Sequence, residues 1–255
     1  MEKFLELKDV SYSYHTLEAE TLALNNINFS VDEGNFISIV GPSGCGKSTL
    51  LNLLSGLTSP ESGEILRNGK PLDRTTTNIG YMLQKDHLFE WRTIYSNVIL
   101  GLEIQNKLND ESKERVDKML DSYGLSNFTA SRPSQLSGGM RQRAALIRTL
   151  ALEPDLLLLD EPFSALDYQT RLEVCDDMYR ILKEQKKTTI LVTHDLSEAI
   201  SVADRVVILT KRPGTIAKII PLSFEEAGLS PLKRRNAKEF PAYFNEIWRE
   251  LSHNG

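Results

Sequence analysis

Short apolar runs and longer segments with helical spacing alternate along the chain. The runs at residues 36–40, 156–159 and 188–192 are largely apolar and β-branched or leucine-rich, which predicts strands. The segments at 110–123 and 139–152 instead carry their apolar residues in a helical pattern. Buried strands that alternate with helices are typical of an α/β fold.

The remaining pattern predicts an additional β part and several more helices. Residues 5–14 and 22–31 indicate strands, and Asn68-Gly69 is a turn signal between two extended pieces. Residues 206–210 and 215–220 predict a hairpin. Further helices are expected at 47–54, 96–107, 168–186, from 196 onward, and 240–251.

The segment between the strand at 36–40 and the helix at 47–54 has the pattern of a phosphate-binding loop. Glycines without a Cβ let the backbone approach phosphate oxygens, and the positive end of the following helix favours their charge. Lys47 can reach the β- and γ-phosphates, and the Ser48 hydroxyl can bind Mg²⁺. The residues expected to bind ATP are Gly41, Pro42, Ser43, Gly44, Cys45, Gly46, Lys47, Ser48 and Thr49. We also expect the helix N-terminus to favour the thiolate of Cys45.

Two carboxylates follow the leucine-rich strand at 156–159. The carboxyl ends of strands are where open α/β sheets bind ligands. Asp160 is expected to hold Mg²⁺, and Glu161 to act as the general base that activates water.

A second anion-binding pattern is Ser137-Gly138-Gly139, at the start of the helix predicted near residue 139. Ser137 can cap this helix, and its hydroxyl and the free N–H groups can bind phosphate. We expect these three residues to contact a nucleotide phosphate.

In their order and spacing, these motifs resemble those of the ATP-binding subunits of ABC transporters, over about the first 220 residues. The resemblance assigns Walker A to Gly41–Thr49, the Q-loop to Gln84, the signature to Leu136–Met140, Walker B to Leu156–Glu161, the D-loop to Ser164–Asp167 and the switch histidine to His194.

The resemblance also implies roles for residues outside the phosphate loop. Gln84 would contact Mg²⁺ and the attacking water while sensing a membrane partner, and His194 would bond to the γ-phosphate. Asp167 would bridge two subunits, and it can also cap the helix that follows. Tyr14 lies where the family has an aromatic ring that stacks on adenine. Tyr12 is the competing candidate, and both can be ordinary strand residues.

The fold implied by the resemblance is a P-loop NTPase core, a mixed α/β sheet flanked by helices with an antiparallel β part, and an inserted helical subdomain. We expect the ABC ATPase domain at residues 1–220, with the helical subdomain at about 87–152, and a C-terminal extension at 221–255. One helical face of this extension is apolar, with Phe240, Phe244, Ile247, Trp248 and Leu251. This face either packs on the protein's own core or binds a partner, and Lys233–Arg235 is expected to be a solvated basic patch.

Composition excludes several other classes. The formal net charge of −5 over 255 residues does not indicate a nucleic-acid-binding surface. Two distant cysteines suggest neither a disulfide framework nor a zinc cluster, as expected in a reducing cytosol. The N-terminal segment lacks the form of a signal peptide, and no apolar stretch approaches the roughly 20 residues that cross a bilayer. Transport would therefore require separate membrane subunits.

The segment Gln84–Thr93 resembles the Q-loop region of importers for nitrate, sulfonates, taurine, bicarbonate and thiamine precursors. Trp91-Arg92-Thr93 and the tail Glu246–Leu251 carry this resemblance, whereas Glu90 departs from the expected proline. We expect an ATP-hydrolysing importer subunit at the cytoplasmic face of the membrane. Its partners would be a second copy arranged head to tail around ATP, membrane permease subunits and a solute-binding protein. The alternative is a soluble ABC-type assembly ATPase, which shares every catalytic motif.

Overall fold

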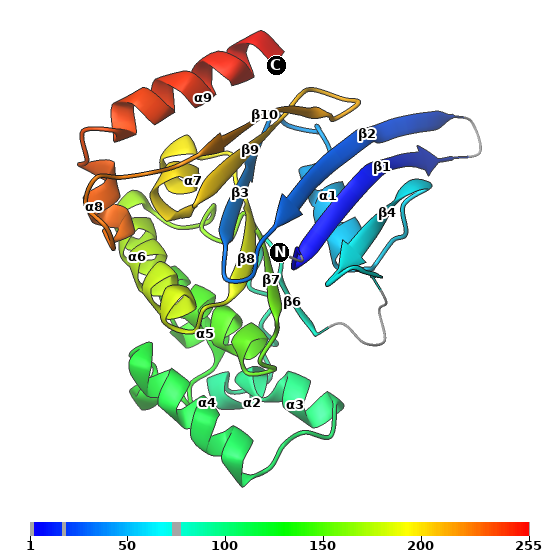
Figure 1. Ribbon diagram of the computed structural model, residues 1–255. Helices are drawn as coiled ribbons and strands as arrows, with labels where there is room; N and C mark the ends of the chain where they lie inside the picture. The colour runs from blue at the N-terminus through cyan, green and yellow to red at the C-terminus, as the bar shows by residue number, and fades with distance from the viewer. Residues whose placement is uncertain (1–2, 17–18, 73–77, 255) are drawn as a thin grey trace. The chain divides into compact units, whose positions relative to one another are not determined.

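The computed structural model describes residues 3–16, 19–72 and 78–254. The chain divides into two compact units. The first comprises Met1–Thr77 and Tyr179–Gly255, and the second comprises Asn78–Met178. The helical segment expected at about 87–152 lies within the second unit, which also contains the strands β6 and β7 (Figure 1).

An antiparallel sheet forms one part of the first unit, in the order β2-β1-β4-β5. Its strands are β1 (Leu5–His15), β2 (Glu20–Val31), β4 (Ser62–Arg67) and β5 (Lys70–Pro71). Asn68 and Gly69 both have positive φ, 48° and 71°, between the paired strands β4 and β5. The predicted Asn-Gly turn is therefore confirmed, since such turns need left-handed residues.

A second sheet region in the first unit has the strand order β10-β9-β3-β8. The strands are β3 (Phe36–Val40), β8 (Thr188–Val192), β9 (Arg205–Leu209) and β10 (Ile216–Pro221). β3 runs parallel to β8 and β9, and β10 is antiparallel to β9, which confirms the predicted hairpin. Every residue of β3 and β8 is buried, as a strand covered on both faces requires. α1 (Lys47–Leu54) and α7 (Leu196–Val202) belong to the same unit.

The second unit joins one parallel strand pair to several helices. β6 (Ile79–Met82) runs parallel to β7 (Leu156–Asp160). The helices are α2 (Ile94–Val98), α3 (Leu100–Ile104), α4 (Asp110–Ser122), α5 (Gly138–Leu150) and the short 3₁₀ turns η1 (Ser126–Phe128) and η2 (Pro133–Gln135). The single helix predicted at 96–107 is wrong, because Ile99, with ψ of −6°, separates α2 from α3. α6 (Tyr168–Glu184) carries the chain from the second unit into the first.

The C-terminal extension forms α8 (Pro231–Arg235) and α9 (Phe240–Asn254). Ile247 is fully buried against residues of β9, β10 and α7, and its neighbours on α9 pack on the same cluster: Phe240, Tyr243, Phe244 and Leu251. The interpretation that this helix packs on its own core is therefore confirmed. Trp248 was wrongly assigned to that face, since its side chain is 60% exposed.

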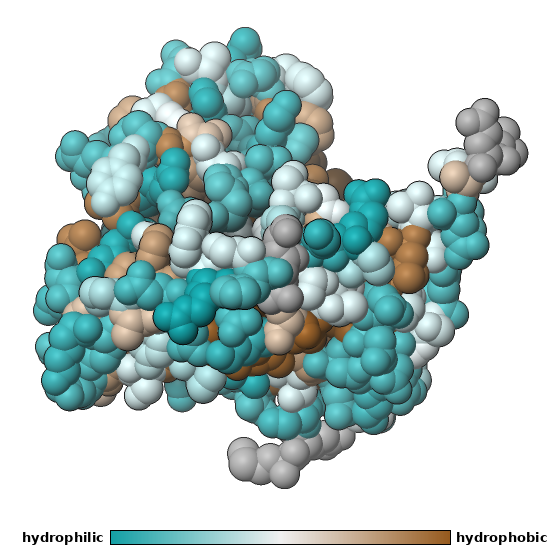
Figure 2. Space-filling model, turned by 90° about the horizontal axis from the view of Figure 1, so that it is seen from above, coloured by the Kyte–Doolittle hydropathy of each residue, from teal (hydrophilic) through white to brown (hydrophobic). Residues whose placement is uncertain are grey.

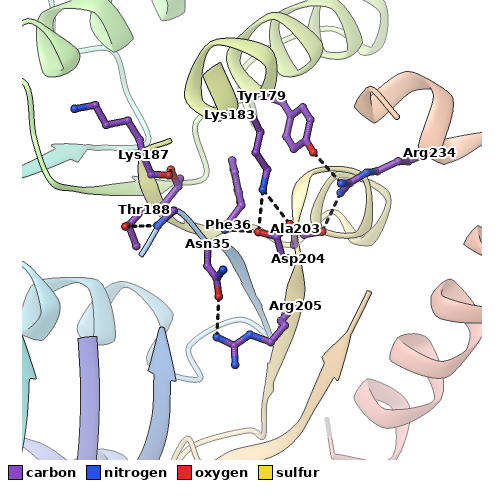
Figure 3. A network of polar contacts seen from close by, with 12 residues as sticks. Asn35, Phe36, Tyr179, Lys183, Lys187, Thr188, Ala203, Asp204, Arg205 and Arg234 are labelled. Carbon is purple, nitrogen blue, oxygen red and sulfur yellow. Dashed lines mark hydrogen bonds and ion pairs between the residues drawn. The ribbon is translucent and has the colours of Figure 1, made fainter. Parts of the chain in front are cut away.

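The expectation of a solvated basic patch at Lys233–Arg235 is wrong for Arg234. Its guanidinium donates to the carbonyl oxygen of Ala203 at 2.9 Å and to the hydroxyl of Tyr179 at 2.8 Å (Figure 3). In the same network, Lys183 donates to the carboxylate of Asp204 at 3.0 Å. This cluster ties α8 to the end of α6 and to the start of β9, which attaches the extension to the first unit.

We expect Ile247→Ala to lower the free energy of unfolding by about 2–5 kcal/mol, because it opens a cavity in a packed cluster. Trp248→Ala, one residue along the same helix, is the control and should change stability far less. Chemical denaturation of both variants measures the difference. Equal effects of the two substitutions would contradict the packing described for α9.

The described helices include none with the length and apolar character needed to span a bilayer. In the view from above, hydrophilic residues predominate and hydrophobic ones lie in separate patches among them (Figure 2).

Candidate functional site

The predicted phosphate loop connects β3 to α1, and its backbone fits a phosphate group. Gly44 and Gly46 have φ of +73° and +103°, in the left-handed region that favours glycine. A Cβ on Gly46 would lie 2.6 Å from the Cδ2 atom of Leu24, so only glycine fits there. The first turn of α1 has no side-chain cap, and its backbone N–H groups remain suited to an anion.

Lys47 extends its side chain back into this loop. Its Nζ donates to the carbonyl oxygens of Gly41 at 2.8 Å and Pro42 at 3.0 Å. The residue is buried, and no carboxylate within the described ranges forms an ion pair with it. The Nζ also lies 3.9 Å from the Cys45 Sγ, so its partners in the described ranges are all uncharged, and an anionic ligand would compensate the charge of this buried ammonium. The surroundings of Lys47 therefore fit a phosphate.

The expectation that Cys45 favours the thiolate is wrong. Its side chain is fully buried, and a Cβ on Gly41 would lie 2.8 Å from its Sγ, so the sulfur packs beneath the loop. Burial raises the pKa of the Cys45 thiol, and the nearby charge of Lys47 opposes this only in part. Desolvation therefore changes the pKa of this thiol more than the helix N-terminus does.

Tyr14 lies close to α1, while Tyr12 lies beside it on β1. The Tyr14 hydroxyl is 2.9 Å from the Thr49 Oγ1, and its side chain is 45% exposed. The two tyrosine rings contact each other edge to face, with centroids 5.1 Å apart. This tether to the helix that follows the phosphate loop favours Tyr14 over Tyr12 as the adenine-stacking residue, and the stacking itself stays a prediction.

His194 lies at the same sheet edge as the phosphate loop. β3 and β8 are parallel, with Ile39 opposite Val192, so their carboxyl ends coincide. The side chain of His194 is exposed. Next to it, the Asp195 carboxylate caps α7 by accepting from the Glu198 N–H at 3.1 Å. The first unit thus brings Lys47, Ser48 and His194 to one edge of the sheet that contains β3 and β8, and Tyr14, on the other sheet, contacts Thr49 of α1.

In the second unit, Gln84 and Glu161 lie in contact. The Gln84 amide Nε2 donates to the Glu161 Oε2 and to the Ser164 Oγ, both at 3.3 Å. The Ser164 hydroxyl in turn donates to the Glu161 carbonyl oxygen at 3.0 Å. Glu161 has φ of +45°, which is uncommon for a residue other than glycine and costs local strain. Ser164 lies in the segment assigned to the D-loop, but its contact with Gln84 was not predicted, because this contact depends on the fold.

Asp160 ends β7 and lies near Tyr81 of the neighbouring strand. Burial raises the pKa of the Tyr81 hydroxyl, and the negative charge of Asp160 adds to this effect. Carboxylate, amide and hydroxyl oxygens are the donors that Mg²⁺ prefers. Asp160 and Gln84 in this unit carry oxygen donors of this kind, and so does Ser48 in the first unit.

The signature and D-loop residues lie at the starts of two helices. The Ser137 Oγ accepts from the Met140 N–H at 3.4 Å and caps α5, after which Gly138 and Gly139 form its first turn. A Cβ on Gly139 would lie 2.6 Å from the Thr170 Cγ2, so glycine permits close packing of α5 on α6.

Asp167 precedes α6 and accepts from the Thr170 N–H at 3.1 Å, which confirms the predicted helix cap. Hydrogen bonds from the side chain and backbone of Thr170 lower the pKa of the Asp167 carboxyl. Its role between subunits stays a prediction.

The segment after Gln84 is fixed to α5 by two arginines that the sequence did not single out. Arg148 donates to the carbonyl oxygens of Asp86 at 2.6 Å and His87 at 2.7 Å. Arg141 Nε donates to the Asp86 carboxylate at 3.1 Å. We call these contacts of Arg141 and Arg148 with Asp86 and His87 the clamp. A pocket of about 350 Å³ lies beside it, lined in part by Lys85, Gly138 and Leu166. Hydrogen bonds therefore join the segment after Gln84 directly to the signature helix.

Phe89 and Trp91 form an exposed aromatic pair beyond this clamp. Their ring centroids are 4.7 Å apart, and Trp91 is 73% exposed. Trp91 therefore does not fill the core of the helical region, whereas Ile94 is fully buried and belongs to that core. Glu90, which departs from the family's proline, accepts from the Ser134 N–H at 3.1 Å.

Comparison with known proteins gives one consistent family. The ABC transporter family model matches residues 24–164, more than half of the chain. The ABC transporter ATP-binding protein YtlC of Bacillus subtilis is 46% identical over 98% of this chain and 96% of its own length. The aliphatic sulfonates import ATP-binding protein SsuB of Bacillus thuringiensis is 35% identical, over 98% of this chain and 97% of its own.

Solved structures agree with these relatives. The dimeric ATP-binding cassette MJ0796, bound to ADP and Pi in a post-hydrolysis state, superposes with a TM-score of 0.73 at 32% identity, over 86% of this chain and 99% of its own. The cbiO1 protein of Clostridium perfringens, part of the ABC transporter complex cbiONQ, gives 0.77 at 27% identity, over 99% of this chain and 98% of its own. These likenesses confirm the cassette fold, a mixed α/β core with an antiparallel β part and a helical region. The chain belongs to the ATP-binding proteins of ABC transporters, and it is an ATPase whose hydrolysis of ATP is coupled to transport.

Proposed function

We propose that this chain drives an importer for a small anionic solute of the sulfonate or nitrate kind, or for a vitamin precursor. The likeness to a sulfonate import protein over nearly the full length of both chains supports this class. The solute itself would be selected by other subunits, because the motor does not contact it. The location that follows is the cytoplasmic face of the membrane, reached through permease subunits.

The observation that carries the proposal is the exposed aromatic pair of Phe89 and Trp91. Large exposed aromatic side chains that stack on each other are suited to anchor a protein partner. Asn97, which is fully buried, holds the turn beneath the pair: its amide accepts from the Phe89 N–H at 2.7 Å and donates to the Phe89 carbonyl at 3.1 Å. The pair is therefore presented on a preorganised turn, as a docking site for a permease helix needs.

A docking event at this turn has a physical route to the catalytic residues of the same unit. The turn follows the clamped segment at Asp86 and His87, which Arg141 and Arg148 join to the signature helix. Gln84, just before the clamp, bonds to Glu161. A shift of the permease helix would therefore move Gln84 and the signature helix together, because a continuous series of contacts joins them.

For hydrolysis, we propose that the phosphate loop and Lys47 bind the triphosphate, that Tyr14 stacks on adenine and that His194 bonds to the γ-phosphate. Glu161 would take a proton from the attacking water, and Gln84 would orient that water. Ser48, Asp160 and Gln84 would hold Mg²⁺, which neutralises phosphate charge when bound.

The chain carries one phosphate loop and one Ser-Gly-Gly signature, so we propose a head-to-tail dimer in which each signature completes the other copy's site. The isologous arrangement gives two equivalent ATP sites. The dimeric relative bound to ADP and Pi supports this arrangement. Asp167, exposed at the start of α6, would lie between the subunits.

A soluble assembly ATPase remains the alternative function, and the identity of the partner separates the two. We expect affinity purification of the chain from its native membranes to recover a permease and a solute-binding protein. The recovered complex, reconstituted in vesicles, should take up the solute only with ATP hydrolysis. Recovery of a soluble scaffold with no permease would overturn the importer proposal.

A further inference from the structure

We propose that Arg212 is a positioning residue for the phosphate loop: it holds the Gly44 carbonyl outward, so that the N–H of Cys45 faces the interior of the loop. The inference rests on the proposed role of this loop in binding the triphosphate. Arg212 itself does not touch the nucleotide in this proposal; it acts through the peptide that joins Gly44 to Cys45.

The orientation of this peptide follows from two hydrogen bonds. The Nε of Arg212, whose side chain is exposed, donates to the Gly44 carbonyl oxygen at 3.2 Å. The Cys45 N–H donates to the carbonyl oxygen of Pro42, a residue of the same loop, at 3.3 Å. Because a trans peptide is planar, its C=O and N–H point in opposite directions. Fixing the carbonyl outward therefore fixes the N–H inward.

The peptide between Gly44 and Cys45 needs a hydrogen bond that fixes it, because a glycine backbone rotates easily. Gly44 has φ of +73°, and glycine crosses between backbone regions at little cost. A rotation of the 44–45 peptide would break the hydrogen bond from the Cys45 N–H to Pro42 and turn a carbonyl oxygen toward the interior of the loop, where the phosphate is proposed to bind. The hydrogen bond from Arg212 selects the donor orientation before the nucleotide arrives, and preorganisation of this kind strengthens binding.

The segment that carries Arg212 is itself fixed to the loop and to β2. The Gly214 N–H donates to the Ala23 carbonyl at 2.9 Å, and the Asn25 N–H donates to the Gly214 carbonyl at 2.9 Å. A Cβ on Gly214 would lie 2.1 Å from the Cys45 carbonyl oxygen, so the two backbones are in direct contact. This close approach keeps the Arg212 side chain in reach of Gly44.

The Arg212 side chain is exposed and forms no ion pair with a carboxylate in the described ranges. A structural salt bridge therefore does not account for it. Its one hydrogen bond within these ranges is the contact with Gly44, which makes the role testable by removing only that donor.

The test compares three substitutions that separate the donor from the charge. Arg212→Gln keeps an amide nitrogen at the position of Nε without the charge, Arg212→Met has similar length and no donor, and Arg212→Lys keeps the charge but shifts the donor. We expect the Arg212→Met and Arg212→Lys variants to bind MgATP more weakly and to have a KM raised about threefold to tenfold, the scale of one hydrogen bond. Their kcat at saturating ATP should change less. Arg212→Gln should stay within about twofold of the unsubstituted chain.

Lys211→Met, which removes the neighbouring exposed charge, is the matched control and should leave binding unchanged. Thermal melting of each variant reports folding, and the Lys variant provides the comparison should the Met variant fail to fold. The proposal is overturned if Gln and Met weaken binding equally, if Lys binds like the unsubstituted chain, or if none has an effect. Lys47→Ala tests the underlying site: retained ATP binding there would overturn the proposed function of the loop, whatever Arg212 does.

Discussion

Glu161→Gln should bind MgATP nearly as tightly as the unsubstituted chain and lose most of its hydrolysis. A positioned general base contributes about 10²- to 10⁴-fold to the rate, and an amide cannot take the proton. The substitution preserves size, and an amide oxygen can still accept the bond that Gln84 donates to this side chain at 3.3 Å. The loss should therefore fall on kcat and not on nucleotide affinity.

Without hydrolysis, ATP-bound dimers should accumulate, and size-exclusion chromatography with MgATP measures them. Glu111→Gln on α4 is the control, since Glu111 is an exposed glutamate of the same unit and its substitution changes the net charge equally. Turnover of Glu161→Gln at the unsubstituted rate would falsify the assignment of the base. Dimers that form equally in the Glu111 control would show that charge, and not blocked hydrolysis, drives association.

Much of the phosphate loop was predictable because its requirements are local. A glycine-rich turn between a buried strand and a helix needs residues with a left-handed backbone conformation, and Gly44 and Gly46 adopt it. The caps at Ser137 and Asp167 were predictable for the same reason, since a cap bonds to an N–H three residues on.

Contacts between distant segments were not predictable in this way. The bond between Gln84 and Glu161 joins residues 77 positions apart, and only the parallel pairing of β6 with β7 brings them to the same edge. The order of the motifs located Gln84 and Glu161, but it did not predict that they are in contact or that Ser164 also bonds to Gln84. The same holds for Arg234, whose basic neighbours in the sequence suggested a solvated patch.

Burial also contradicts two predictions that were made from the sequence, those for Trp248 and Cys45. Helical spacing put Trp248 beside Ile247 on one apolar face, yet a turn of about 100° per residue carries Trp248 past the edge of the core. Cys45 was expected to be acidic from its distance to a helix N-terminus, but desolvation beneath the loop raises its thiol pKa.

Trp91→Ala should keep ATP binding and lose association with the permease, together with uptake in reconstituted vesicles. Truncation of a central aromatic anchor commonly weakens an interface by tenfold or more. The side chain is 73% exposed, so its removal opens no core cavity and the variant should melt close to the unsubstituted chain. Pull-down of the permease and ATP-driven uptake are the measurements, with ATP affinity of the isolated subunit beside them.

Trp248→Ala provides a matched control, since it removes a second exposed tryptophan, 60% exposed, from α9. If both variants bind the permease as the unsubstituted chain does, Trp91 is not the anchor, and the aromatic pair loses its role in docking. If only the Trp248 variant loses the permease, the docking surface lies on the C-terminal helix instead. Loss confined to Trp91→Ala would favour an importer over a soluble assembly ATPase, because that alternative has no permease helix to bind at the turn after Gln84.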